Sequence, residues 1–389
     1  MIQKLLFFGL FIFSLTLQAQ VTGLVTDADN IALPYVNVYV KDATLGTTTN
    51  ASGKYQLALD KPGTYTLVFQ FLGFTKQEIK IAPQEFPYVL DVTLSPETTS
   101  LDEVVVDAQS NPADRIIQAV IAKKPQILEK KQAYTADFYS RGIWRVENAP
   151  EKFFGQDIGD LGGGLDSTRS GIVYLSETLS KIAVNKPDDF KETISASKVS
   201  GDDNGFSFNS AQEAEFSFYD NTLEVNTELV SPLADNAFNY YTYKLEGAFR
   251  ESGKLINKIT VSPKGENDRI LVVNGAAIQV PFIESLGFKH SFKYDQELDL
   301  WIKISQNIDF SFKMLGFGGN GRFTAVYSNY NFNPEFQRGT FTREVLSFKP
   351  EANKKDSIFW QLARRVPLTL EERNDYTFKD SLQEKRNSK

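Results

Sequence analysis

Cysteine is absent from the sequence, and histidine occurs once, as His290. Without cysteine the chain forms no disulfide and no thiolate metal site, and it cannot be lipidated after an export signal. A zinc site of two histidines and a glutamate is excluded as well. A Ser-His-Asp triad would need His290, yet no Gly-x-Ser-x-Gly surrounds any serine, so we interpret His290 as a strand-face or surface residue. We expect no enzymatic activity, no metal and no cofactor.

The chain has fewer basic than acidic residues. The chain has 42 Lys and Arg residues against 49 Asp and Glu residues, a net charge of −7. Nucleic acid and anionic lipid surfaces both attract basic patches, so the acidic balance argues against either as a partner. No segment after residue 19 is apolar and long enough to form a membrane helix.

The N-terminus is typical of an export signal. Lys4 precedes an apolar run from Leu5 to Leu17, and Leu17-Gln18-Ala19 resembles a cleavage site. We predict that residues 1–19 are a signal peptide. A membrane anchor is the alternative, but the run is short for a hydrocarbon core of roughly 30 Å. A cysteine-free exported chain fits the periplasm or outer membrane of a bacterial envelope.

Residues 20–97 predict a small β-sandwich. Apolar and polar residues alternate from Val21 to Asp27, and Val36, Val38 and Val40 share one face of a second strand. Thr47 to Tyr55 is typical of a strand, a turn and a strand. Further β segments are expected at 64–71, 77–81 and 89–94. Short strands separated by turn residues over this length predict a sandwich.

Four motifs in this unit carry a resemblance: Gly23-x-Val25-x-Asp27, Leu33-Pro34-x-Val36-Asn37-Val38, Gly46-Thr47-x-Thr49-Asn50-x-x-Gly53-x-Tyr55 and Phe71-Leu72-Gly73-Phe74. Together they resemble the carboxypeptidase regulatory-like domain, a transthyretin-like, Ig-like sandwich. The unit is similar to the N-terminal extension of TonB-dependent receptors in Bacteroidota, which runs into a Leu-Asp-Glu-Val-Val-Val phrase. The resemblance implies a docking fold and not a peptidase.

Residues 98–110 form a linker that contains this phrase, as Leu101, Asp102, Glu103, Val104, Val105 and Val106. One interpretation is an ordinary strand docked on the sandwich, which strand propensity alone favours. The other is a recognition strand that adds to the sheet of a partner. The second interpretation makes these six residues candidates for docking.

Residues 111–350 predict an α+β domain. Asn111-Pro112 opens a helix with apolar residues at helical spacing, and Pro125 ends or kinks it. Candidate strands follow at 134–144, 171–184, 216–219, 240–250, 255–261, 270–273, 290–294, 300–306, 307–312 and 322–332. We expect a curved antiparallel sheet with a helix against its concave face. The fold class is therefore mainly β, a sandwich followed by an α+β domain with a flanking helix.

A second set of motifs runs through this domain, in the order Asp114-Arg115-Ile116-Ile117, Tyr134-x-x-x-Phe138-Tyr139, Tyr174-Leu175-Ser176-Glu177, Ile256-x-Lys258-Ile259-x-Val261-x-Pro263-Lys264 and Pro367-Leu368-Thr369-x-x-Glu372. It resembles a Bacteroidota outer-membrane family of unknown function that couples the regulatory-like domain to a C-terminal β-barrel. Residues 351–389 hold a charged helix, expected from Thr369 to about Arg386, and no barrel strands follow it. We expect either the N-terminal half of a split or truncated barrel protein or a relative without a barrel.

Three further motifs have more ordinary interpretations. Gly316 to Gly321 spells Gly-x-Gly-x-x-Gly, but a β segment follows it where a dinucleotide site needs a helix, so we predict a hairpin or loop. Gly162-Gly163-Gly164 predicts a flexible loop that could serve as a lid. Asp202-Asp203-Asn204 and Asp188-Asp189 lack the spacing of a calcium loop and are expected to be solvated.

Aromatic residues are the remaining candidates for binding. On the sandwich, the residues able to stack on a sugar or peptide are Tyr35, Tyr55, Tyr65, Phe71 and Phe74. The same residues are also needed to fill a small core, which is the more common role. The alternation of Phe206, Phe208, Phe216 and Phe218 is likewise typical of a core.

The sequence thus favours a non-enzymatic binding or docking protein, exported to the periplasm or outer membrane, with an envelope protein as partner. One alternative is a periplasmic carrier, in which a curved sheet closed by a helix holds a lipid or other apolar ligand. Another is a carbohydrate-binding module in which the sandwich binds a glycan.

Overall fold

The computed structural model describes residues 19–96 and 111–388, apart from gaps at 60, 72, 130–132, 154, 188, 203–204, 215, 225–227, 252–253, 265–269, 274–275, 280–282, 296–299 and 315–316. The predicted signal peptide, up to residue 18, and the Leu101–Val106 phrase lie outside the described residues. Among the described residues, no helix combines the length and the apolar character needed to cross a membrane.

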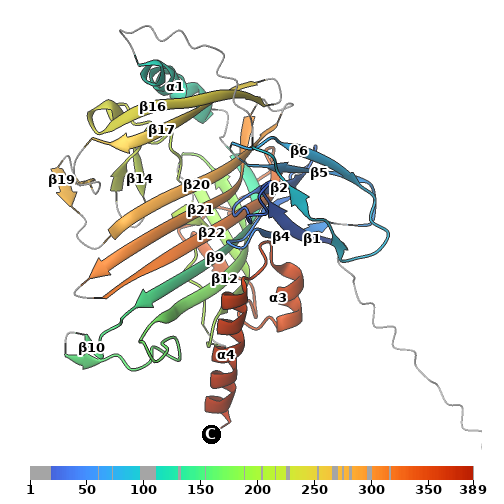
Figure 1. Ribbon diagram of the computed structural model, residues 1–389, viewed down its shortest axis with the longest axis vertical. Helices are drawn as coiled ribbons and strands as arrows, with labels where there is room; N and C mark the ends of the chain where they lie inside the picture. The colour runs from blue at the N-terminus through green and yellow to red at the C-terminus, as the bar shows by residue number, and fades with distance from the viewer. Residues whose placement is uncertain are drawn as a thin grey trace, which may run out of the picture.

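The N-terminal unit is the expected sandwich of two small sheets (Figure 1). One sheet contains β1 (Ala19–Thr26), β4 (Lys54–Leu59), β7 (Tyr88–Val89) and β8 (Val92–Thr93). The other has the order β3 (Gly46–Thr48), β2 (Asn37–Val40), β5 (Tyr65–Gln70) and β6 (Gln77–Ile81). Alternate side chains meet between the sheets, where Val21, Val38 and Leu67 are fully buried. The alternation in the sequence therefore predicted this core correctly.

The second unit is built on a seven-stranded sheet in the order β20-β21-β22-β9-β12-β13-β23. Its strands are β9 (Ala133–Glu147), β12 (Gly171–Asn185), β13 (Asp189–Val199), β20 (Ile283–Asp295), β21 (Leu300–Met314), β22 (Phe317–Asn331) and β23 (Leu346–Phe348). Neighbours are antiparallel except for β13 and β23. The segments expected at 300–306 and 307–312 form one strand, and β13 was not predicted. A short hairpin of β10 (Lys152–Phe153) and β11 (Gln156–Asp157) extends from one end.

Helix α1 (Pro112–Glu129) flanks this unit, but its packing partner differs from the prediction. It begins where the Asn111 side chain accepts a hydrogen bond from the Ala113 amide, and Pro125 lies inside it. Its buried Ala113 and Ile117 pack with Tyr243 of the β16–β17 ribbon, and not on the concave face of the seven-stranded sheet. The ribbon consists of β16 (Tyr241–Glu251) and β17 (Lys254–Pro263), above the large sheet in Figure 1.

Short elements complete this region. They are α2 (Ala211–Ala214), β14 (Thr222–Glu224), β15 (Glu228–Val230), the 3₁₀ helix η1 (Ala237–Asn239), β18 (Ile270–Val273) and β19 (Ala276–Gln279). The strand expected at 216–219 is wrong, because this segment forms a turn. Its aromatic residues are buried by packing against side chains of the large sheet, which gives them a strand-like pattern without strand pairing.

Two helices end the chain, α3 (Ser357–Ala363) and α4 (Leu370–Asn387). The charged helix predicted from Thr369 is confirmed as α4, since Thr369 and Glu372 form a reciprocal capping box. Helix α3 was not predicted. Its Trp360 is fully buried, so a single side chain anchors this short helix.

The two faces of the large sheet are covered by different parts of the molecule. On the face that we call outer, Ile143, Ile172 and Leu175 pack with Tyr376 of α4, and Ile304 packs with Tyr39 and Val68 of the sandwich. On the face that we call inner, Phe138 and Ile182 pack with Ala211 and Ala214 of α2. The sandwich, the C-terminal segment and α4 therefore share one face of the sheet (Figure 1).

The segment between α3 and α4 is wedged between the sandwich and the sheet. Sandwich side chains donate hydrogen bonds to its backbone carbonyls: Thr47 to Arg365, and Asn50 to Pro367 at 3.0 Å. From the opposite side, Arg141 of β9 donates to the Val366 carbonyl at 3.0 Å. Because both partners bind the same few carbonyls, the C-terminal segment fixes the sandwich to the sheet.

Four buried charges hold this wedge, and we call them the ionic lock: Glu177, Arg364, Arg141 and Glu372. The Arg364 Nη2 atom lies 2.8 Å from Glu177 Oε2, and the Glu177 side chain has no solvent exposure. Arg141 Nε lies 3.6 Å from Glu372 Oε1, with both side chains 5% exposed. Tyr139 adds a hydrogen bond from its hydroxyl to Glu177 at 2.7 Å. Each charge thus faces an opposite charge, as buried ions require.

Protonation of Glu177 would break the lock. Burial by itself would raise the pKa of Glu177, but attraction to Arg364 and Arg141 and the bonds from Arg364 and Tyr139 hold it below its usual value. A carboxyl group with a lowered folded pKa stabilises the protein above its unfolded pKa. That stabilisation is lost as the pH falls through the folded pKa.

We expect the substitution Arg364→Ala to cost about 3 kcal/mol of unfolding free energy, because it leaves Glu177 buried without its strongest partner. The measurement is urea unfolding followed by tryptophan fluorescence. The matched control is Arg145→Ala, which removes the Arg145–Glu371 ion pair, whose glutamate side chain is 55% exposed. The control should cost less than about 1 kcal/mol. Equal losses in the two variants would show that the lock contributes no more than a surface pair.

Candidate functional site

Exposed aromatic side chains gather on the inner face of the sheet. Trp144 of β9 contacts Phe310 of β21 at 5.3 Å and Tyr174 of β12 at 6.5 Å between ring centroids. Tyr174 in turn stacks on Phe208 at 5.7 Å. We call Phe310, Trp144, Tyr174 and Phe208 the aromatic row. It crosses the strands at the end of the sheet where β9 stops and β12 starts.

Glycines in β22 make room for this row. A Cβ atom on Gly321 would lie 2.1 Å from the Phe310 ring, and one on Gly319 would lie 2.6 Å from the Phe312 ring. The aromatic rings therefore lie across glycines of the neighbouring strand, which compensates for the missing side chains. β21 ends at Met314 and β22 begins opposite it at Phe317, so the hairpin predicted for the Gly-x-Gly-x-x-Gly run is confirmed, with residues from Phe317 onward on its second strand.

The segment that carries Phe206 and Phe208 reverses the usual pattern of burial. Its polar residues Ser207 and Asn209 are buried, whereas Phe206 is 40% and Phe208 81% exposed. Ser207 donates its amide to the Ser197 hydroxyl at 2.8 Å, and Asn209 donates to the Ser176 hydroxyl at 2.9 Å. The prediction of core positions for both phenylalanines was therefore wrong, because hydrogen bonds on the other side of the segment turn them outward.

A glycine in β9 permits this arrangement. A Cβ atom on Gly142 would lie 2.5 Å from the Asn209 side chain, so only glycine lets Asn209 lie flat on the sheet. Trp144 is 48% exposed, and a second pair, Phe206 and Phe348, is 40% and 45% exposed with ring centroids 4.6 Å apart. Contiguous exposed aromatic surface of this kind marks interaction sites more often than single exposed residues do.

The geometry of the rings indicates which partners fit. Trp144 meets Phe310 at 77° and Tyr174 at 80°, so these three rings present edges and faces in turn, whereas Tyr174 and Phe208 stack with 25° between their planes. A sugar chain stacks on flat aromatic faces, whereas a ridged surface of Trp, Tyr and Phe suits interdigitating apolar side chains. The part of the row around Trp144 therefore favours an apolar, irregular partner surface.

His290 lies in an aromatic nest on the same inner face, formed with Phe216, Phe218, Phe288 and Phe292. Burial lowers its pKa to about 3, and the nearby Lys303 adds to this effect. The His290 Nε2 atom has no hydrogen-bond partner among the described residues. The neutral imidazole of His290 packs among phenylalanine rings and so holds the 216–218 turn against β20. Phe216 and Phe218 are thus the two members of the phenylalanine alternation that are packed inside.

The aromatic candidates on the sandwich lie mostly inside the structure. Tyr55 is 1% exposed and donates its hydroxyl to the Leu90 carbonyl, while Phe71 and Phe74 pack against the sandwich core. Tyr35 is 8% exposed, beneath Lys289 and Arg322 of the large sheet. Tyr65 is partly buried and donates to the Lys61 carbonyl. Tyr35 and Tyr55 therefore offer no open ring face to a sugar.

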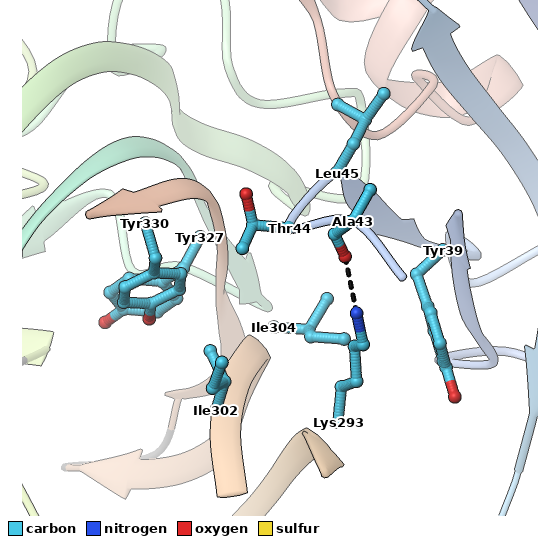
Figure 2. A pocket seen from close by; sticks show the side chains of 9 residues that line it. All are labelled: Tyr39, Ala43, Thr44, Leu45, Lys293, Ile302, Ile304, Tyr327 and Tyr330. Atoms are coloured by element: carbon cyan, nitrogen blue, oxygen red, sulfur yellow. Dashed lines mark hydrogen bonds between the residues drawn. The ribbon is translucent and has the colours of Figure 1, made fainter. Parts of the chain in front are cut away.

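The junction between sandwich and sheet is closely packed (Figure 2). Lys293 donates a hydrogen bond to the Ala43 carbonyl at 2.6 Å, and its ammonium lies 5.7 Å from the Tyr39 ring. Ile304 is an extra residue in β21 with no partner opposite in β20, and it packs against Tyr39. The cavity left here, about 10 Å³, holds at most about one water molecule, so it is no ligand site.

The aspartate-rich segments, the glycine loop and the Leu101–Val106 phrase are the remaining candidates from the sequence, and Asp188 lies outside the described residues. Residues 203–204, like the Leu101–Val106 phrase, lie outside the described residues, and Asp189 bonds to Asn185 at the start of β13. Gly163 lies against Leu382 of α4, so the glycine loop packs on a helix. Within the described part of the chain, no group of three or more His, Cys, Asp or Glu side chains is placed to hold a metal ion.

The low pKa of His290 is directly measurable, because this is the only histidine in the chain. We expect its NMR signals to report a neutral ring down to about pH 4, against an ordinary pKa of 6.5. Since the folded pKa is lowered, the contribution to stability is complete above pH 6.5 and is lost as the pH falls toward 3. Titration between pH 6 and 7 would contradict the nest; the urea-unfolded protein, which should titrate there, is the control.

Comparison with known proteins relates the first unit to receptors. The chain is 40% identical over 105 residues to TonB-dependent receptor P39 of Formosa agariphila, a match that covers 27% of this chain and 10% of the receptor. It is 35% identical over 114 residues to TonB-dependent receptor SusC of Bacteroides thetaiotaomicron, covering 29% of this chain and 11% of the receptor. The chain thus spans about a tenth of the length of these relatives.

Similarity to solved structures is weak. A putative outer membrane lipoprotein-sorting protein domain from Vibrio parahaemolyticus aligns with 59% of this chain and 98% of its own at 7% identity, with a TM-score of 0.21. At this TM-score the alignment carries no argument about fold or function.

Two family models match the chain. Residues 21–106 match the CarboxypepD_reg-like domain, and neither this description nor the second names an enzymatic activity. The second model matches residues 116–275 and 270–330, more than half of the chain. The chain therefore belongs to the Family of unknown function (DUF5686), with a carboxypeptidase regulatory-like domain at its N-terminus.

Proposed function

We propose that this protein is a non-enzymatic docking protein of the cell envelope, in the periplasm or at the outer membrane. Its aromatic row packs against apolar side chains of another envelope protein. One observation carries the proposal: Ser207 and Asn209 are buried while Phe206 and Phe208 face outward. Exposure of large aromatic side chains has a free-energy cost in water, and here buried hydrogen bonds enforce it.

The composition of the row supports a protein partner. Trp and Tyr are enriched among the residues that dominate binding energy at protein interfaces, because each buries a large, rigid area. The relation of the N-terminal unit to TonB-dependent receptors supports an envelope setting. The acidic net charge of −7 makes attraction to an anionic lipid surface a poor alternative.

The sandwich contributes to docking because it is held rigidly against the large sheet. Its contacts with Lys293, Ile304 and the C-terminal segment place it on the outer face, away from the aromatic row. A partner bound at the row therefore meets a rigid body that includes the sandwich. Rigid presentation lowers the entropy lost on binding.

We expect the double substitution Trp144→Ser and Phe208→Ser to release the protein from washed outer membranes. Each change removes an interface aromatic, at a cost of about 2 kcal/mol of binding free energy. The measurement is fractionation of cells with salt and carbonate washes, with an antibody against the protein. Unchanged circular dichroism of the purified variant would exclude unfolding as the cause.

The matched control is Phe378→Ser, since Phe378 on α4 is 54% exposed and lies on the outer side. The control should stay with the membrane fraction as the unchanged protein does. Retention of both variants, or release of both, would contradict docking through the row. If the unchanged protein is already soluble and carries extracted lipid, the carrier alternative replaces docking. Selective glycan binding would instead support the carbohydrate alternative.

A further inference from the structure

A cleft on the outer face of the sheet has no role in the docking just described. It lies between β9, β12 and β13 on one side and the segment 335–340 on the other, and its volume is about 650 Å³. Ligand pockets usually measure about 300–1,000 Å³. The cleft is therefore large enough for a small organic molecule.

The segment over the cleft keeps its own shape. Phe336 and Phe341 pack with ring centroids 4.8 Å apart, and the Thr340 amide and hydroxyl both donate to the Gln337 carbonyl. Lys191 of β13 ties the end of the segment to the sheet by donating to the Glu344 carbonyl at 2.6 Å. The segment thus spans the sheet without filling the space beneath it, which gives a preformed cleft.

The strands of the sheet contribute polar as well as apolar side chains to the cleft. Lys181 of β12 lies opposite Thr193 of β13, and Thr135 lies nearby on the same face of β9. All three side chains line the cleft. Ser195 is an extra residue in β13 with no partner opposite in β12, and this bulge also turns toward the cleft. A sheet face covered by chain is usually apolar, whereas here hydroxyl and ammonium groups share the lining with Tyr139, Leu179 and Ala183.

The charge of the cleft is opposite to that of the chain. Four cationic side chains line it, against two carboxylates: Lys181, Lys191, Lys349 and Arg365 against Asp137 and Glu335. The whole chain has 42 basic and 49 acidic residues. Lys181 lies 3.5 Å from Asp137, and Asn329 donates to Asp137 at 2.8 Å, so Lys181 and Asp137 offset each other while Lys191, Lys349 and Arg365 remain against Glu335. An excess of positive charge therefore faces the space.

We propose that this cleft binds a small ligand with two or more carboxylate or phosphate groups. Lys and Arg side chains beside hydroxyl donors recognise oxyanions through charge-assisted hydrogen bonds. The site does not depend on the proposed docking function, because the cleft and the aromatic row lie on opposite faces of the sheet.

The test is isothermal titration calorimetry of the purified protein with citrate and with inorganic pyrophosphate, at constant ionic strength, with sucrose as a neutral probe. We expect saturable binding of at least one anion and none of sucrose. The double variant Lys181→Gln and Lys349→Gln should weaken anion binding about tenfold. Both side chains are exposed at the rim, so the variant should fold normally.

The matched control is Lys61→Gln with Lys80→Gln, which removes two exposed charges from the sandwich. It should leave the affinity unchanged. Equal weakening by both double variants, or no saturable binding of either anion up to about 10 mM, overturns the proposal. A further experiment measures binding of the protein to vesicles with and without phosphatidylglycerol. If only anionic vesicles bind, and Lys181 and Lys349 are needed, the oxyanion comes from a lipid headgroup and not from a free metabolite.

Discussion

The ionic lock is the constraint on which the arrangement of this protein depends. Glu177 and Arg141 point from the outer face of the sheet toward the C-terminal segment, where Arg364 and Glu372 meet them. Burying four charges costs free energy unless every one is paired, so the segment has only one acceptable position. Sandwich side chains bind the carbonyls of the same segment. The lock therefore determines where the N-terminal sandwich lies relative to the sheet.

At the end of the sheet where β9 stops, α4 covers the outer face, and the exposed aromatic side chains lie on the inner face. There, glycines at 142, 319 and 321 let other groups lie directly on the strands. The Asn209 side chain uses one of these spaces, and aromatic rings use the other two. The result is an aromatic surface held by buried polar contacts.

Local patterns predicted the elements that depend on local physics. Alternation over Val21 to Asp27 predicted a strand because the side-chain period of a strand is two. The charged segment from Thr369 to about Arg386 predicted α4, and the structure shows that a capping box of Thr369 and Glu372 fixes the start of this helix within one turn. Strand β13 was missed because its polar residues face the cleft and the hydrogen-bond network on Glu192, so it shows no apolar alternation.

The sequence alone determined the sandwich and the α+β class of the second unit, since these follow from short-range periodicity. Only the tertiary structure decided which side chains of the segment 206–218 are buried. Phe206 and Phe208 have the same alternation as Phe216 and Phe218, yet the first pair faces outward and the second surrounds His290. The difference arises from partners distant in the chain, Ser176 and Ser197 for one segment and Phe288 for the other. A pattern within a segment carries no information about such partners, because burial is a property of the surface that a segment meets.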